Sequence, residues 1–218
     1  MKLLLILLIL FCSSAEKKVF PELENFTPIE DASLAKKYLP IILDSKEFGN
    51  PVEVLYRASK DKDGKIFITY HFVWEKEENL TSGFYPFLSR NIYTGGLSLQ
   101  KTMFGKKDIE LVSLEIEKDK IVTLEFETAE NYDPKKFGVK HKHLTIKEGI
   151  STPICFKVKS WNHLFEEKPI FSCAEKQNLT EVNYFTEKLW SEYTMTKEKE
   201  GFFSRNRAHK IYEREFIR

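Results

Sequence analysis

The residues from Ile66 to Trp74 constrain the fold of this chain more than any others. They read Ile-Phe-Ile-Thr-Tyr-His-Phe-Val-Trp, a run dense in β-branched and aromatic side chains. Such side chains pack well on the pleated surface of a sheet and are typical of strands. A turn signal, Asp61-Lys62-Asp63-Gly64, comes just before the run. The sequence therefore predicts one long strand at the heart of a β-rich fold.

A predicted hairpin adds two more strands. Ile109 to Glu117 and Ile121 to Thr128 flank the short tip Lys118-Asp119-Lys120. Residues alternate in character along both arms, so one face is expected to pack on a core and the other to meet water. Further strands are predicted at residues 52–57, 143–146 and 154–160.

Helices are predicted at both ends of the chain. Thr27 with Pro28 behind it is a typical helix start, and Pro40 is expected to end that helix. Near the C terminus, Thr180 is expected to cap a helix, with a second amphipathic stretch after Ser204. The apolar stripe of the first of these helices would consist of Val182, Phe185, Leu189 and Tyr193. The predicted fold class is mainly β (α+β), an antiparallel β-sandwich or curled sheet with an N-terminal helix and C-terminal helices over about 180–218.

One aromatic segment between the predicted strands has no clear periodicity. Residues 83–97 contain Phe84, Tyr85 and Phe87 near their start and Gly95-Gly96 near their end. Long loops of this kind often carry function. We expect a packed loop that covers one end of the sheet.

The first fifteen residues resemble a secretory signal peptide. A positive start at Lys2 precedes an apolar run to Phe11, and small residues lead to Ala15. The run is about half the ~20 residues that a membrane-spanning helix needs. We therefore expect cleavage after Ala15, a secreted or periplasmic protein with no transmembrane span, and a single β-rich domain over 16–218. The alternative is a lipid anchor on Cys12.

Charge excludes one class of partner. Loss of Lys2 with the leader leaves 33 basic and 33 acidic residues, and such a balance argues against a general nucleic-acid binder.

The motifs of serine hydrolases, zinc-helix enzymes and calcium loops are absent from the sequence. We expect a non-enzymatic module that binds a protein, sugar or lipid, without a cofactor. The alternative is a metal-dependent hydrolase or a membrane-active secreted protein.

Two cysteines follow the leader. In an exported chain, Cys155 and Cys173 are expected to form a disulfide, the alternative being two separate buried thiols.

N-glycosylation sequons begin at Asn25, Asn79 and Asn178 and matter only in a cell that glycosylates exported proteins.

Four residues form a candidate cation site. His71 and Glu75 share one face of the long predicted strand, and Asp108 and Glu110 share a face at the start of the hairpin. If sheet pairing joins the two pairs, one imidazole and up to three carboxylates suit a divalent ion. The alternative is that these groups lie at a solvated strand edge.

His141 and His143 form a second, weaker candidate. Both imidazoles point the same way in an extended segment, but a third ligand must come from elsewhere. The candidates for that ligand are Asp108, Glu110, His71 and His163. The alternative is an exposed basic loop.

A ligand pocket is the third candidate. Trp161 and His163 lie in Ser160-Trp161-Asn162-His163-Leu164-Phe165, after a predicted strand. Together with Trp74 they would form a polar and aromatic wall that stacks on sugars or lipids. The alternative is a turn that buries Trp161.

Three short segments resemble secreted β-sandwich proteins around the necrosis-inducing family. They are Leu34-Ala35-Lys36-Lys37-Tyr38-Leu39-Pro40, the strand end Trp74-Glu75, and Asp108-Ile109-Glu110. The likeness covers about half of the chain, and the heptapeptide signature of that family is absent. The resemblance implies a metal-dependent, membrane-damaging activity and a cation site at His71, Glu75, Asp108 and Glu110.

Overall fold

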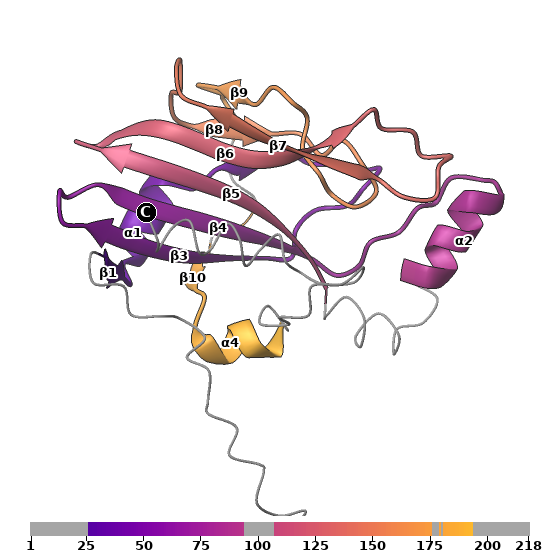
Figure 1. Ribbon diagram of the computed structural model, residues 1–218, viewed down its shortest axis with the longest axis horizontal. Coiled ribbons are helices and arrows are strands. Elements are labelled where there is room, and N and C mark those ends of the chain that lie inside the picture. The colour runs from indigo at the N-terminus through magenta and orange to yellow at the C-terminus, as the bar shows by residue number, and fades with distance from the viewer. Residues whose placement is uncertain (1–25, 94–106, 176–178, 180, 194–218) are drawn as a thin grey trace, which may run out of the picture.

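A computed structural model describes residues 26–93, 107–175, 179 and 181–193 of the protein (Figure 1). Its centre is a seven-stranded sheet in the order β1-β3-β4-β5-β6-β7, with β10 beside β3 on the same edge as β1. All neighbours are antiparallel except β10 and β3. The strands are β1 Phe26–Ile29, β3 Glu53–Asp61, β4 Ile66–Trp74, β5 Asp108–Glu117, β6 Lys120–Glu130, β7 Lys140–Ile146 and β10 Asn183–Tyr184. The mainly β fold class is confirmed.

A smaller sheet lies against one face of the large one (Figure 1). It consists of β2 Ile41–Ile42, β8 Ile154–Phe156 and β9 Ile170–Phe171. The main core cluster joins both sheets, with Tyr70 and Phe72 from β4 and Phe156 from β8. Phe72, Phe156 and Phe165 are fully buried and meet in edge and tilted contacts. This packing gives the described part of the chain its sandwich character.

Helix α1, Ala32–Tyr38, covers part of the same core. Its N-cap is Asp31, whose carboxylate accepts hydrogen bonds from the backbone N–H groups of Ser33 and Leu34 at 2.8 and 3.1 Å. The predicted start at Thr27 was wrong, because Thr27 belongs to β1 and pairs with Lys60. The helix ends before Pro40, as predicted.

The hairpin tip is one residue shorter than predicted, because Lys120 belongs to β6. Glu117 of β5 pairs with Lys120 of β6, which leaves Lys118 and Asp119 as a two-residue loop. Both loop residues have positive φ, 49° and 63°, the signature of a type I′ turn that matches the twist of the strands. Asp119 then accepts a hydrogen bond from the ammonium of Lys37 at 2.8 Å and ties the tip to α1.

The second face of the large sheet carries a smaller cluster. Leu55, His71 and Leu111 pack there against Phe185 and Trp190 from the C-terminal part of the described chain. Helix α4, Glu187–Glu192, follows β10 and covers this face.

The predicted C-terminal helices are corrected in part. Residues 183–184 form a strand because they pair with Leu55 and Tyr56 of β3, and helix begins only at Glu187. Thr180 and residues 194–218 lie outside the described residues, as does the leader with Cys12.

Residues 84–93 form helix α2, Phe84–Tyr93, and not the predicted packed loop. It stands at one end of the long axis of the molecule, clear of both sheets (Figure 1). The rest of the predicted loop, residues 94–97, lies outside the described residues.

A disulfide joins Cys155 of β8 to Cys173 just after β9, with Cα atoms 6.2 Å apart, as predicted. The bond links β8 to the residues that follow β9 in the small sheet. No helix in the described part of the chain is long and apolar enough to cross a membrane.

Candidate functional site

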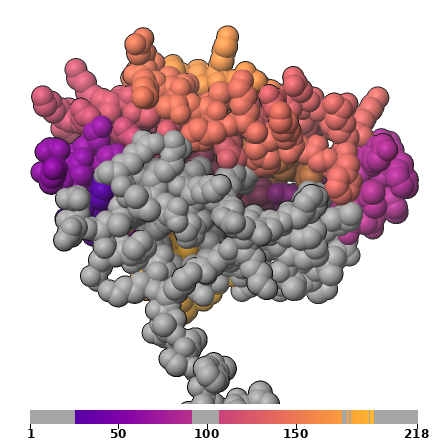
Figure 2. Space-filling view, viewed as in Figure 1, coloured from indigo at the N-terminus to yellow at the C-terminus, as the bar shows by residue number. Residues whose placement is uncertain are grey.

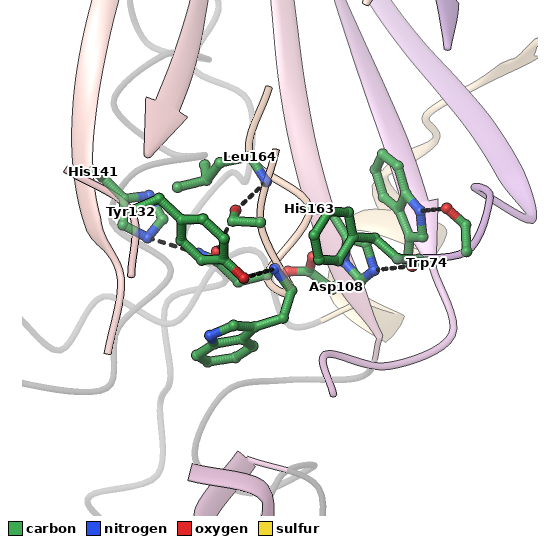
Figure 3. A network of polar contacts seen from close by, with 11 residues as sticks. Trp74, Asp108, Tyr132, His141, His163 and Leu164 are labelled. Carbon is green, nitrogen blue, oxygen red and sulfur yellow. Dashed lines mark hydrogen bonds and ion pairs between the residues drawn. The ribbon is translucent and has the colours of Figure 1, made fainter. Parts of the chain in front are cut away.

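Several loops meet where β4 ends and β5 begins, and residues 160–165 lie among them (Figure 3). We call these six residues the central turn. The backbone N–H of Trp161 donates to the hydroxyl of Tyr132 at 3.3 Å. The ring of Tyr132 in turn contacts the edge of Phe48, at a centroid distance of 6.5 Å. The central turn therefore connects loops that are far apart in the sequence.

His163 fastens the central turn to the large sheet. Its Nδ1 lies 2.7 Å from Oδ2 of Asp108, and its Nε2 lies 3.0 Å from the carbonyl oxygen of Phe48. The ring stacks on Trp74 with centroids 4.6 Å apart and planes 12° from parallel. Both ring nitrogens therefore face oxygen atoms, and the contact between the imidazole and the Asp108 carboxylate is buried on both sides.

A second polar chain crosses the central turn. The Nδ1 of His141 lies 2.8 Å from Glu127, and the amide of Asn162 donates to Nε2 of His141 at 3.2 Å. The Ser160 hydroxyl donates to Oδ1 of Asn162 at 2.7 Å and accepts from the backbone N–H of Leu164 at 3.2 Å. The chain ties the central turn to β6 and β7.

Both networks consist of groups that bond to one another. Ser160 and His163 are buried, and a nucleophile or general base must reach its substrate. The Ser160 hydroxyl is already both donor and acceptor, and His163 already has two partners. Ser160 and His163 therefore hold the central turn in place, whereas His141 of the second network is partly exposed, with 36% of its side chain accessible.

The predicted four-residue cation site is not assembled. Cross-strand partners share a face of a sheet, and Asp108 pairs with Trp74 while Glu110 pairs with Phe72. Both carboxylates therefore lie on the face of the main core, whereas His71 pairs with Leu111 on the opposite face. The prediction failed because it did not fix the register between the two strands.

His71 is fully buried and not at a solvated edge. Its ring makes edge contacts with Phe185 and Trp190 at centroid distances of 4.8 and 5.7 Å. Neither ring nitrogen has a hydrogen-bond partner among the described residues. Burial lowers the pKa of His71 to about 3, helped by the positive charge of Arg57 and opposed by the nearby backbone of β3 and β4.

Glu75 lies outside the sheet and forms an ion pair with Lys107 at 3.1 Å. Both residues line an open pocket of about 500 Å³ that also includes Glu53. The Glu53 carboxylate accepts a hydrogen bond from the hydroxyl of Tyr193 at 2.5 Å. Burial, with help from this hydrogen bond, raises the pKa of Tyr193. Of the carboxylates that line this pocket, Glu75 is thus paired with Lys107 and Glu53 is hydrogen-bonded to Tyr193.

His141 and His143 lie on one face of β7, as their spacing predicted, but their neighbours are not the expected ones. His141 contacts Glu127, and Nε2 of His143 lies 3.9 Å from Glu125, both on β6. Of the predicted third ligands, Asp108 and Glu110 face the main core and His163 is paired with Asp108. The fourth, His71, is buried against α4.

Across the described ranges, one trio of ligand atoms comes within 4.8 Å, namely Cys155, Cys173 and Glu175. Its two sulfur atoms are joined in the disulfide and cannot offer thiolates. Among the described residues, no other three ligand atoms from His, Cys, Asp or Glu lie within that distance of one another.

The predicted ligand pocket of Trp74, Trp161 and His163 is also corrected. All three side chains are buried. The face of Trp74 is occupied by His163, and its indole N–H donates to the carbonyl of Gly49 at 3.3 Å. A sugar or lipid cannot stack on rings that the protein itself covers. The alternative of a turn that buries Trp161 describes the structure.

Sequence reasoning placed residues 83–97 in a loop and so missed an exposed surface on α2. Phe84 is 71% exposed, Tyr85 and Phe87 are each 56% exposed, and Leu80 just before the helix is 70% exposed. We call these four residues the aromatic surface. Figure 2 shows α2 as the part of the molecule at one extreme of the long axis.

Helix α2 is held by its polar side. The Arg90 guanidinium donates to the carbonyl oxygens of Asn79 and Thr81, the second at 3.2 Å. The Asn79 amide donates to the carbonyl of Pro134 at 2.8 Å, and the Ser89 hydroxyl donates to that of Phe137. Asn79 and Ser89 are buried. Ser89 and Pro86 of the helix are therefore buried, whereas Phe84, Tyr85 and Phe87 are exposed together with Asn91.

A sequence signal for this helix exists. Pro86 falls in the first turn of α2. Backbone N–H groups of the first turn have no partner within a helix, so the missing N–H of proline costs no hydrogen bond there. The outward face was not predictable, because aromatic residues at helical spacing normally indicate the buried side.

The comparisons with known proteins leave the structure as the main evidence. The resemblance to the necrosis-inducing family stays a prediction. Comparison of this chain with protein-family models, with curated proteins and with solved structures finds no match.

Proposed function

We propose that this protein is an exported, non-enzymatic binding module that docks to its partner through the aromatic surface on α2. The observation that carries this proposal is the exposure of three aromatic side chains on one short helix. Soluble proteins rarely expose large apolar groups together unless the patch has a binding role.

The way in which α2 is held supports the proposal. Asn79 and Ser89 donate to carbonyls of the loop at residues 134–137, and Arg90 ties the helix to the segment that holds Asn79 and Thr81. The central turn holds that loop through Tyr132. Aromatic groups on a pre-organised element bind with less loss of conformational freedom than groups on a loose loop. The buried polar networks thus serve the exposed surface.

The test compares binding to intact cells of the producing organism. Protein from expression of the full chain is added to cells, and the cell-bound fraction is measured. We expect the triple variant Phe84→Ser, Tyr85→Ser, Phe87→Ser to lose at least about tenfold in binding. Ile170→Ser, which removes an exposed apolar side chain from β9, is the matched control and should bind like the unmodified protein. Equal binding of the triple variant would refute the proposal.

Export has its own test. N-terminal sequencing of protein recovered outside the cytoplasm is expected to begin at Glu16. An intact Met1 on cytosolic material contradicts the leader, and a lipid on Cys12 would place the protein on a membrane surface.

A further inference from the structure

We infer that the partner of the aromatic surface is the interfacial region of a lipid bilayer, into which Phe84, Tyr85 and Phe87 insert. This inference rests on the proposed function and names the class of partner for the same surface. Aromatic side chains are favoured at the headgroup level of membranes, and Tyr adds a polar tip that stays in water.

The size of the aromatic surface favours a bilayer over a second protein. With about 150–250 Å² for each fully exposed aromatic side chain, the four residues expose roughly 400–500 Å². A stable protein–protein interface needs about 800 Å² from each partner. Shallow insertion into a membrane interface has no such requirement, because lipids close around a small protruding element.

The chemistry around the rings disfavours a sugar ligand. Sugar sites combine an aromatic platform with polar groups that fix the hydroxyls. The polar side chains of this region donate instead to backbone carbonyls within the protein: Arg90 to Asn79 and Thr81, Ser89 to Phe137. Asn91 on the helix donates to the carbonyl of Phe87 at 2.7 Å. Asn91 is an exposed polar side chain on the helix, and its amide nitrogen already donates within the helix.

Two lysines border the docked helix and suit an anionic membrane. Lys135 and Lys136 lie between the carbonyls of Pro134 and Phe137 that accept hydrogen bonds from Asn79 and Ser89. Both lysines are exposed. Ammonium groups near a negatively charged bilayer each strengthen binding.

Acidic residues also occur close by and limit this charge effect. Glu78, in the segment before α2, forms an ion pair with Lys76. Asp133 begins the turn that carries the two lysines and accepts a hydrogen bond from the backbone N–H of Lys135 at 3.0 Å. We therefore expect the aromatic side chains to supply the main attraction and the lysines to add a preference for anionic lipid.

The test uses protein-free vesicles in a flotation assay. One set contains phosphatidylcholine alone, and the other contains about 30% phosphatidylglycerol. We expect binding to both, stronger to the anionic set, and at least about a tenfold loss in the triple variant Phe84→Ser, Tyr85→Ser, Phe87→Ser. Lys135→Gln with Lys136→Gln should lower binding to anionic vesicles by about fivefold for each lysine and leave phosphatidylcholine binding unchanged.

The controls separate this inference from the proposed function. Ile170→Ser should bind vesicles like the unmodified protein, and urea unfolding should show that the variants are folded. If cells bind through the aromatic surface but vesicles do not, the partner is a protein or sugar and the bilayer inference is wrong. If neither cells nor vesicles respond to the triple variant, the inference and the proposed function both fail. Equal vesicle binding by the triple variant, with a folded structure, also overturns the inference.

Discussion

The buried imidazole of His71 should make the protein sensitive to mild acid. His71 lies on β4 between β3 and β5, against Phe185 and Trp190, with Arg57 as its charged neighbour. Its pKa is about 3 in the folded protein, against an ordinary value of 6.5. Between these values the unfolded chain binds a proton that the folded protein does not. Stability is therefore highest above pH 6.5 and falls as the pH decreases toward 3.

The size of the effect follows from the two pKa values. At pH 5 the unfolded imidazole is almost fully protonated, and the free energy of unfolding should be about 2 kcal/mol lower than at pH 7.5. The substitution His71→Leu keeps a similar volume and removes the titrating group. Although repacking changes its absolute stability, this variant should lose about 2 kcal/mol less than the unmodified protein between the two pH values.

The assay is urea unfolding followed by tryptophan fluorescence at pH 7.5 and pH 5. His143→Leu removes a partly exposed imidazole and leaves His71 in place, so it should keep the acid sensitivity of the unmodified protein. The reasoning is refuted if His71→Leu and the unmodified protein lose the same stability between the two pH values.

Three other features give direct predictions. Asp108→Asn removes the carboxylate from the buried hydrogen bond to His163 and should lower the free energy of unfolding by about 3 kcal/mol, whereas Asp119→Asn at the exposed hairpin tip should have a much smaller effect in the same urea titration. Asn79 should carry no glycan when the protein is made in a glycosylating cell, since its amide nitrogen is buried and donates to a backbone carbonyl; a glycopeptide containing Asn79 from folded protein would contradict this. Cys155→Ser with Cys173→Ser opens a loop of 18 residues and should cost about 3 kcal/mol, and an unchanged urea midpoint would count against that estimate.

The strands were predictable because their signal is local. The run that becomes β4 ends at Trp74 in both the prediction and the structure. The hairpin was predicted with a tip at Lys118-Asp119-Lys120, and the structure has the same hairpin with a loop of Lys118 and Asp119, since charged residues between two alternating segments indicate a tight turn. The disulfide was also predictable, because two cysteines behind a leader-like segment are expected to pair, and the structure confirms it.

The candidate cation site failed for a reason that sequence periodicity cannot overcome. Alternation shows which residues of one strand share a face, but it does not tell which face of the next strand is on the same side. That depends on register, and a shift of one residue exchanges the two faces. In the structure Asp108 stands opposite Trp74, so the carboxylates of the hairpin point away from His71.

The helix errors have a related cause. Thr27 and Pro28 fit a helix start, but an edge of β3 offers backbone partners and draws residues 26–29 into a strand. Residues 183–184 likewise form a strand because they pair with the same edge of β3. Tertiary pairing overrode local preference at both ends of the chain.

The polar networks and the aromatic surface belong to one arrangement. His163 has a left-handed backbone, with φ of 59°, and a buried ring with two acceptors. A side chain in that conformation is strained unless its surroundings fix it. Asp108 and Trp74 fix it, and the central turn that results holds the hydroxyl of Tyr132 and, with it, the loop on which Asn79 and Ser89 anchor α2. Buried polar groups add little stability but can select one conformation among several. In this protein they fix the loops that hold α2 at one end of the molecule.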